Sequence, residues 1–208
     1  MLHFSTVEPD TFQLLTSLMQ VPELGAFALA GGTCLALRYG HRKSIDIDLF
    51  STQDFDNDEL VEKLNENGFV FQETFFANKI EVFGKIKHIK VDFVRHHQFP
   101  ILQPLELNHD IRMFSDPDII AMKIQAVLRR AVKKDFWDIA ELLSHYSMDF
   151  FTECYQKKYP NQLLLISIPR ALSYFDDAEN SPAPNCLRGW TWEDVKQKIR
   201  HAVNEYLK

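Results

Sequence analysis

Residues 28–50 decide the fold, and they read ALAGGTCLALRYGHRKSIDIDLF. The apolar run over 26–30 predicts a buried strand, and the glycine pair that follows it predicts a tight turn. Apolar and acidic residues alternate over 45–50, which predicts a second strand with one buried face. Between the two strands the pattern predicts a short helix over 34–39 that Thr33 can cap.

The glycine turn and the second strand carry the residue types of a metal-bound phosphate site. Gly31 and Gly32 let backbone N–H groups approach a ligand and open a helix whose N-terminus favours an anion, and Thr33 adds a hydroxyl. Strand periodicity places Asp46 and Asp48 on one face, with oxygens near enough to share one or two hard cations. Magnesium prefers a few carboxylates together with substrate phosphate oxygens. The pattern therefore favours a nucleoside triphosphate bound with Mg²⁺.

A third carboxylate lies on a later strand. Residues 88–94 alternate well, with Ile89, Val91 and Phe93 on one face. Asp92 lies on the opposite face. If this strand pairs next to the strand that carries the other two aspartates, three carboxylates converge, and the sequence predicts a two-metal site.

Each of these elements has a simpler interpretation when it is taken alone. A glycine pair is most often just a turn, and acidic residues that alternate with isoleucine and leucine most often face solvent. A single aspartate in mid-strand is also more often solvated than catalytic. Two aspartates on one strand after a glycine-opened helix repel each other unless they share a cation, and this favours the metal site.

Composition places the chain among soluble globular proteins. It has 208 residues, of which 46% are hydrophobic and 25% charged, and a formal net charge of -6. The acidic balance argues against a dedicated nucleic-acid coat but permits a local basic patch. The three cysteines have no CxxC spacing, which indicates neither a disulfide framework nor a zinc site. With no visible signal peptide or bilayer-spanning run, we expect a cytoplasmic protein with no membrane partner.

The chain is predicted to be an α+β fold with a soft boundary near residue 115. An α/β mixed-sheet core is expected over 1–115, followed by an all-helical domain over 116–208. Further core strands are expected over 69–76, 79–83 and 88–94, with a short one over 111–114. Core helices are expected over 9–20 and, capped by Ser51 or Thr52, up to Gly68. The second half is expected to be helical over 117–132, 135–146, 149–158, 161–175 and 192–207, with a loop over 180–189.

Lys123 stands out in the helical half because it lies in an apolar run, where a lysine needs a partner. Only basic charges occur between residues 119 and 134, and they are Lys123, Arg129, Arg130, Lys133 and Lys134. A positive helix face of this kind suits a triphosphate or an RNA backbone. It is equally typical of a solvated face that keeps a protein soluble.

Two blocks of the sequence resemble the signature of the AbiEii-type toxin family of nucleotidyltransferases. The first block is 31–50, and the second joins 118–123 to the stretch Lys134-Asp135-Phe136-Trp137-Asp138. With Asp92, the resemblance covers about residues 30–140. It implies the minimal nucleotidyltransferase fold of DNA polymerase β-like enzymes, with a helical domain that completes the nucleotide pocket.

The resemblance also implies roles for the residues of the first block and for Asp92. Gly32 and Thr33 would hold the β- and γ-phosphates, with Gly31 in the same phosphate-binding turn. Asp46 and Asp48 would bind the metals. Asp92 would complete the second metal site and help to deprotonate the acceptor hydroxyl.

Three residues of the second block and one residue before the acidic strand are further candidates for the nucleotide site. Lys123 would contact the triphosphate, and Asp135 and Asp138 would shape the pocket from the helical domain. Arg42 is a further candidate for substrate contact. Many nucleotidyltransferases carry Gly-Ser and a shorter gap to the first aspartate, so the loop over 40–44 must be accommodated here.

The sequence therefore predicts a Mg²⁺-dependent nucleotidyltransferase that moves a nucleoside monophosphate from a triphosphate to an acceptor hydroxyl. The resemblance implies a tRNA or protein acceptor and the toxin of a toxin–antitoxin or phage-defence pair, with a cognate antitoxin as partner. One alternative is an Asp-x-Asp glycosyltransferase, which needs neither the Gly-Gly-Thr helix start nor Asp92. The other is a non-catalytic nucleotide- or partner-binding module on the same fold, against which the presence of both Asp46 and Asp48 argues.

Overall fold

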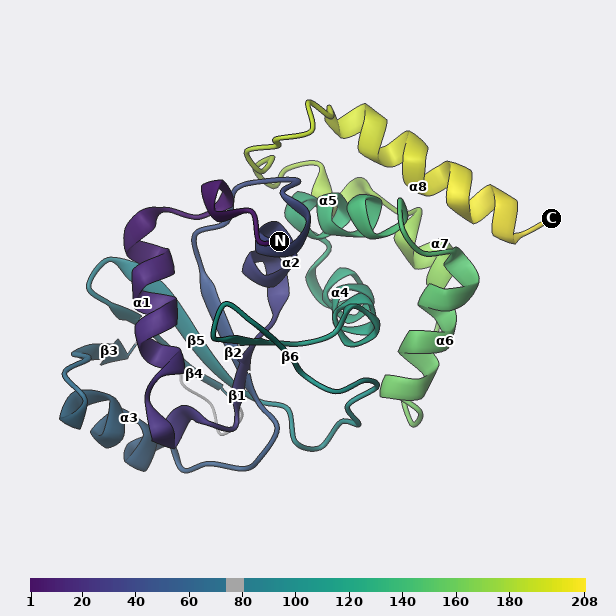
Figure 1. The fold of residues 1–208 in the computed structure, drawn as a ribbon. Coiled ribbons are helices and arrows are strands. Elements are labelled where there is room, and N and C mark those ends of the chain that lie inside the picture. The colour runs from purple at the N-terminus through teal and green to yellow at the C-terminus, as the bar shows by residue number, and fades with distance from the viewer. Residues whose placement is uncertain (74–80) are drawn as a thin grey trace. The chain divides into compact units, whose positions relative to one another are not determined.

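The computed structural model describes residues 1–73 and 81–208 (Figure 1), and the chain divides into two units. The first unit consists of Met1–Arg38, Ser44–Phe99 and Leu105–Phe114. The second consists of Tyr39–Lys43, Pro100–Pro104 and Ser115–Lys208. Two short segments of the N-terminal half thus belong to the helical unit.

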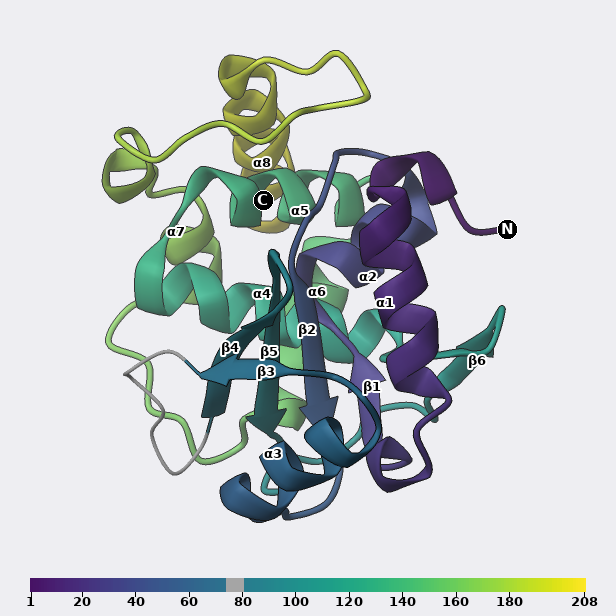
Figure 2. The same ribbon diagram turned by 90° about the vertical axis from the view of Figure 1, so that its left-hand side faces the viewer.

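Seven strands of the described residues form one mixed sheet in the first unit, in the order β3-β4-β5-β2-β1-β7-β6 (Figure 2). Their bounds are β1 Phe27–Leu29, β2 Ile47–Ser51, β3 Phe71–Glu73, β4 Glu81–Ile86, β5 Ile89–Arg95, β6 Glu106–Asn108 and β7 Ile111–Met113. Strand β2 pairs antiparallel with β1 and parallel with β5. The acidic strand of the sequence therefore lies inside the sheet, between two hydrogen-bonded neighbours.

The helices of the first unit are α1 (Pro9–Met19), α2 (Gly31–Tyr39) and α3 (Asn57–Glu66). Helix α1 has a proline in its first turn, and its 3.6-residue period buries Leu15 and Leu18 completely. Helix α2 directly follows β1 and is buried along most of its length. The glycine turn is therefore fixed between a central strand and a buried helix.

The structure corrects the predicted caps of two helices. Helix α2 begins at Gly31, so Thr33 lies inside the helix and does not cap it. The cap of α3 is Asp56, whose carboxylate accepts hydrogen bonds from two backbone N–H groups, and not Ser51 or Thr52. Neither helix begins at the hydroxyl residue that the sequence pattern favoured. Gly31 supplies the turn before α2, and Asp56 supplies the cap of α3.

The edges of the sheet also differ from the sequence-based expectation. Strand β3 falls within the strand predicted over 69–76, and β4 overlaps the one predicted over 79–83 and continues to Ile86; residues 74–80 lie outside the described residues. Strand β6 is not among the strands expected from the sequence, but it forms a hairpin with β7. His109 and Asp110 form its two-residue turn at φ values of 50° and 61°, the left-handed region that tight hairpins require.

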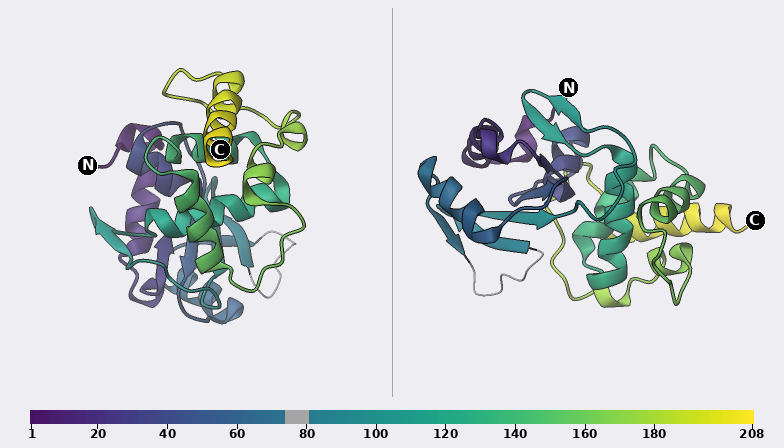
Figure 3. Two further views of the ribbon diagram at one scale, coloured as in Figure 1. Left: turned by 90° about the vertical axis from the view of Figure 1, so that its right-hand side faces the viewer. Right: turned by 90° about the horizontal axis from the view of Figure 1, so that it is seen from below.

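The second unit is built from five helices within the described residues (Figure 3). They are α4 (Asp116–Arg130), α5 (Lys133–Leu142), α6 (Met148–Lys158), α7 (Ile168–Leu172) and α8 (Trp192–Tyr206). Helix α4 packs against α5, α6 and α7, and α8 packs against α5. The rings of Trp137 and Trp192 stack with centroids 5.4 Å apart and fix α8 on α5.

The helix predicted over 161–175 is mostly wrong, because only Ile168–Leu172 is helical. Pro169 lies in the first turn of α7, where its fixed φ starts a helix, and the chain before it is extended at Ser167. Leu163 and Leu165 are exposed and bury no helical stripe. No helix among residues 1–73 and 81–208 has the length and apolar character needed to cross a membrane.

Candidate functional site

The sheet brings two of the predicted metal-binding carboxylates side by side. In the parallel ladder between β2 and β5, Asp48 is the direct partner of Asp92. Neighbouring strands lie about 4.8 Å apart, and residues at the same register share a face of the sheet. Asp46 precedes Asp48 by two residues, and its charge also acts on Asp92. The condition set by the sequence, that the two acidic strands be neighbours, is met.

Asp92 is buried and electrostatically strained. Its Oδ2 accepts a hydrogen bond from Lys90 Nζ, but its buried Oδ1 has no hydrogen-bond partner among the described residues. Burial raises the pKa of Asp92 to about 6; Lys90 opposes the rise, and the negative charges of Asp48 and Asp46 add to it. A buried carboxylate oxygen without a partner is costly, and a bound cation would remove that cost.

Gly31 permits the close approach of the glycine turn to Asp48. Its φ is +65°, a conformation that L side chains rarely adopt. A Cβ atom at this position would overlap Asp48 Oδ2. The Ala30 N–H donates to the Asp48 carbonyl at 3.0 Å, which fixes the backbone of the turn on β2. The first N–H groups of a helix have no carbonyl acceptors within it, and those of α2 therefore lie beside a carboxylate side chain.

Thr33 ties the same turn to the start of β2. Its hydroxyl donates to the Asp46 carbonyl and lies 2.9 Å from Ser44 Oγ. Thr33 is 1% exposed, so the hydroxyl that the sequence assigns to phosphate is engaged within the protein. Gly31, Gly32 and Thr33 are therefore placed next to the acidic strand, and their contact with phosphate stays a prediction.

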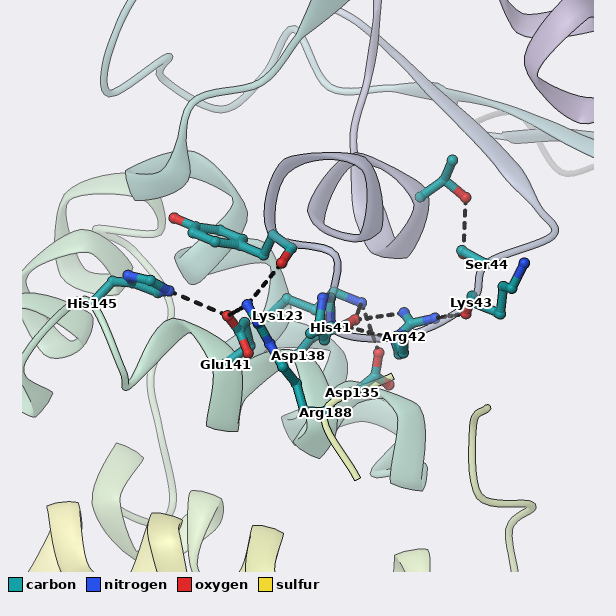
Figure 4. A network of polar contacts seen from close by, with 12 residues as sticks. His41, Arg42, Lys43, Ser44, Lys123, Asp135, Asp138, Glu141, His145 and Arg188 are labelled. Atoms are coloured by element: carbon teal, nitrogen blue, oxygen red, sulfur yellow. Dashed lines mark hydrogen bonds and ion pairs between the residues drawn. The ribbon is translucent and has the colours of Figure 1, made fainter. Parts of the chain in front are cut away.

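Lys123 lies in a polar network of the second unit rather than alone in an apolar run (Figure 4). Its Nζ is 3.0 Å from Asp135 Oδ1 and 2.6 Å from Asp138 Oδ2. Burial alone would lower the pKa of Lys123, but the carboxylates of Asp138 and Asp135 outweigh it and raise the pKa. The partner that the sequence required for this lysine is thus a pair of aspartates on α5.

Asp138 also holds the chain before the acidic strand. Arg42 donates from Nε to Asp138 Oδ1 at 2.7 Å and from Nη2 to Oδ2 at 2.8 Å, a bidentate pair. His41 Nε2 lies 2.7 Å from the same Oδ1. Burial alone would raise the pKa of Asp138, but Arg42, Lys123 and His41 outweigh it and hold that pKa well below its ordinary value. Asp138 is therefore an anion with partners on both oxygens.

Four residues that the sequence assigns to nucleotide binding meet in this network, and they are Arg42, Lys123, Asp135 and Asp138. Asp135 and Asp138 are fully buried, and the cations that face them come from the protein itself. Burial alone would raise the pKa of Asp135, but Lys123 and Arg130 outweigh it and lower the pKa. A direct nucleotide contact for these four residues stays a prediction.

Sequence reasoning did not foresee three contacts that shape these two clusters. Lys90 lies two positions before Asp92, and strand periodicity, which places both on one face, was the available signal. His41 joins Asp138 from a loop, and Ser44 contacts Thr33 across ten intervening residues. Neither contact has a local sequence signal, because both depend on how the chain folds back.

Asp92→Asn is expected to raise the melting temperature of the metal-free protein at pH 7.5 by a few degrees. Because the pKa of Asp92 is raised to about 6, the folded protein binds this proton more tightly than the unfolded chain does. The stability gained by protonation is present at low pH and lost as the pH rises through about 6. Asparagine removes the charge that is unfavourable above that pH, so the gain should shrink towards pH 5.

Thermal melts of the wild type and of Asp92→Asn across this pH range provide the measurement. Asp54→Asn is the matched control, because Arg95 lowers the pKa of this exposed aspartate and its loss should not stabilise the protein. An Asp92→Asn variant that melts below the wild type at pH 7.5 would show that the Asp92 charge is favourable in the fold.

Comparisons with known proteins concern the family and the fold of the chain. Residues 13–185 match the family model described as "Nucleotidyl transferase AbiEii toxin, Type IV TA system". A protein of Aquifex aeolicus (strain VF5), described as uncharacterized, is 33% identical over 190 residues, which cover 87% of this chain and 88% of the relative.

Two solved structures share the fold. MenT4, a nucleotidyltransferase toxin of Mycobacterium tuberculosis H37Rv, aligns with a TM-score of 0.61 at 15% identity, over 92% of this chain and 81% of that chain. JHP933 from Helicobacter pylori aligns with a TM-score of 0.53 at 13% identity, over 96% of this chain and 92% of that chain. At these identities the likeness is one of fold, and it supports the predicted mixed sheet with C-terminal helices.

Proposed function

Because the chain belongs to the AbiEii nucleotidyl transferase toxin family, we propose that it transfers a nucleoside monophosphate from a nucleoside triphosphate to an acceptor hydroxyl. One observation carries the proposal: Asp48 and Asp92 are direct partners on parallel strands, beside the glycine that opens α2. Neither a simple turn nor a solvated strand face explains why a buried aspartate lies next to a second aspartate.

The residues of the acidic cluster fit Mg²⁺. Asp92 Oδ1 is buried without a partner, and Asp46 and Asp48 are the other carboxylates whose charges act on it. No group of three His, Cys, Asp or Glu side chains in the described part of the chain is arranged to hold a metal ion by itself. Mg²⁺ usually keeps one or two carboxylates and takes substrate phosphates as further ligands, so substrate oxygens would complete the shell. When bound, the metal would neutralise negative charge on the transferred phosphate.

The chain's own residues would orient the triphosphate and accept the acceptor's proton. Backbone N–H groups at the start of α2 favour an anion, which we assign to the β- and γ-phosphates beside Gly31, Gly32 and Thr33. Asp92, the direct partner of Asp48 on the neighbouring strand, is the carboxylate that we assign to accept the proton of the acceptor hydroxyl. Positioning and charge stabilisation then supply most of the rate enhancement.

The family supports a toxin role with a cognate antitoxin as partner. The acceptor that we propose is a tRNA or a protein. The reaction needs triphosphates and Mg²⁺, which places it in the cytoplasm. Arg129 is exposed near the end of α4 and, with the neighbouring Arg130, offers positive charge to an acceptor with a phosphate backbone.

Label transfer tests the proposal directly. The purified protein is incubated with each α-³²P-labelled nucleoside triphosphate and Mg²⁺, together with total tRNA or with a protein extract. We expect label from one triphosphate to appear in one of the two acceptor pools. The Asp46→Asn/Asp48→Asn double variant is the matched control, which should transfer no label. Equal labelling by wild type and double variant would overturn the proposal.

A further inference from the structure

Residues Tyr39–Lys43 connect the two parts of the candidate site along the chain. They begin at Tyr39, the last residue of α2, which carries the glycine turn, and they precede β2, which carries Asp48. Although both flanking parts belong to the first unit, Tyr39–Lys43 itself belongs to the second. We call Tyr39–Lys43 the connecting segment.

Side chains of α4 and α5 hold the connecting segment through Asp138. The bidentate pair with Arg42 and the contact with His41 engage both Asp138 oxygens (Figure 4). Arg42 is 3% exposed, and both His41 and Asp138 are 0% exposed. A buried bidentate arginine–carboxylate pair fixes orientation as well as distance. The connecting segment therefore has one defined position in the helical unit.

The C-terminal region holds the same segment through its backbone. The Lys43 N–H donates to the Asn185 carbonyl at 2.9 Å, and the Leu187 N–H donates to the His41 carbonyl at 2.8 Å. Arg42 and Cys186 form an antiparallel bridge between these two bonds. The loop predicted over 180–189 thus supplies a short pairing partner. We call residues 185–188 the pairing segment.

Arg188 completes the pairing segment. Its Nη2 donates to the Tyr39 carbonyl at 2.8 Å and to Glu141 Oε1 at 3.0 Å. The carboxylate of Glu141, which is 3% exposed, in turn lies 3.3 Å from His145 Nε2. The connecting segment is thus bonded at Tyr39, His41, Arg42 and Lys43.

The connecting segment is joined directly to the candidate site along the chain. Ser44 follows the connecting segment. Its Oγ lies 2.9 Å from Thr33 Oγ1, and the Ser44 N–H donates to the Thr6 carbonyl at 2.9 Å. Thr33 also donates to the Asp46 carbonyl. A shift of the connecting segment would therefore move Ser44 and alter the contact between the glycine turn and the acidic strand.

We propose that Asp138 and Arg42 are positioning residues for nucleotidyl transfer, and that the pairing segment supports them. They hold the connecting segment, and through Ser44 they keep Asp46 and Asp48 in register with the phosphate-binding turn. This inference rests on the proposed function. It gives the C-terminal region, for which the sequence offers no role, a part in shaping the site.

The chain offers a matched control in Asp118. Asp118 is also fully buried and is also paired with a buried lysine, Lys158, at 2.6 Å. It accepts hydrogen bonds from the N–H groups of Leu102 and Gln103, and so it holds Pro100–Pro104, the other segment that joins the helical unit. That segment does not lead into the glycine turn or the acidic strand.

The test compares Asp138→Asn and Arg42→Lys with Asp118→Asn at a temperature where all variants are folded. Misplacement of reacting groups by about 1 Å can cost about 100-fold in rate, so Asp138→Asn should lower kcat by about 10- to 100-fold. The KM for the triphosphate should change by less than about threefold, because the phosphate-binding N–H groups remain. Arg42→Lys keeps the charge but loses the bidentate geometry, and it should lose part of kcat.

Asp118→Asn should lower the melting temperature at least as much as Asp138→Asn does, yet keep kcat within about twofold. Equal losses of kcat in Asp118→Asn and Asp138→Asn would overturn the inference, because a general loss of stability would then explain both. Full activity of both Asp138→Asn and Arg42→Lys would overturn it as well.

Hydrogen exchange separates this inference from the proposed function. The Lys43 and Leu187 amides should exchange faster in Asp138→Asn than in Asp118→Asn, whether or not the protein transfers nucleotides. A wild type that transfers no nucleotide would contradict the proposed function, while faster exchange would still show that Asp138 holds the segment. Unchanged exchange in Asp138→Asn would contradict the inference alone.

Discussion

Asp48→Asn is expected to lower the rate of nucleotide transfer by about 1,000-fold or more while the protein stays folded. Asp48 pairs with Asp92 and lies beside Gly31, so it is next to both another proposed metal ligand and the glycine turn. Loss of a metal ligand removes several kcal/mol of charge stabilisation, and about 1.4 kcal/mol corresponds to a factor of ten in rate. Label transfer under single-turnover conditions measures the effect.

The fold should not suffer, because asparagine has the same shape and relieves repulsion between neighbouring carboxylates. Asp56→Asn is the matched control. Asp56 lies in the same unit and caps α3 by accepting hydrogen bonds from backbone N–H groups, which asparagine also does. This control should keep activity within about twofold. An Asp48→Asn variant with more than about a tenth of wild-type activity would contradict the assigned role.

Gly31→Ala is expected to have the second largest effect, with a loss of about 100-fold in transfer. The new Cβ would overlap Asp48 Oδ2, so either the Asp48 side chain or the glycine turn must move. The positive φ of Gly31 adds backbone strain of about 1 kcal/mol. Transfer rate and triphosphate affinity should therefore fall together.

Gly68→Ala separates the effect of backbone strain from the effect of displacing the turn or the Asp48 side chain. Gly68 also has a positive φ, +81°, but a Cβ there would meet nothing within 4 Å. This variant should lose similar stability and keep its activity. If Gly31→Ala transfers nucleotides as well as Gly68→Ala does, the close approach of Gly31 to Asp48 is not part of the site.

The acidic cluster was predictable because period-two alternation fixes the face of each strand residue without any knowledge of the fold. Alternation placed Asp48 on one face of its strand, and it placed Asp92 opposite Ile89, Val91 and Phe93. It also put Asp46 in the strand, but β2 begins at Ile47, so Asp46 lies just before it. Sequence alone left open which strands are neighbours. The parallel pairing of β2 with β5 supplied that missing fact.

The connecting and pairing segments were not predictable, because their contacts join distant parts of the chain through backbone atoms. Nothing in the residue types at 185–188 indicates a bond to Lys43 or His41, since any residue with an N–H or carbonyl can make it. The roles of Asp118 and Asp138 were hidden for a related reason. An aspartate at a helix start predicts a cap, whereas Asp118 binds backbone N–H groups of a distant segment.

Membership of the nucleotidyltransferase family argues against the Asp-x-Asp glycosyltransferase that the sequence left open. The contact between Gly31 and Asp48 points in the same direction, because a glycosyltransferase of that kind does not need the glycine-opened helix. The other alternative, a non-catalytic binding module, predicts no turnover. The comparison of the wild type with Asp48→Asn measures turnover and so tests this alternative.

Calorimetric titration of the wild type with each of the four nucleoside triphosphates, with and without Mg²⁺, tests the central claim most directly. We predict that one triphosphate binds only when Mg²⁺ is present and that the Asp46→Asn/Asp48→Asn double variant loses this binding. Equal binding by the double variant, or no Mg²⁺-dependent binding of any triphosphate by the wild type, would contradict the claim that this acidic cluster is a metal–nucleotide site.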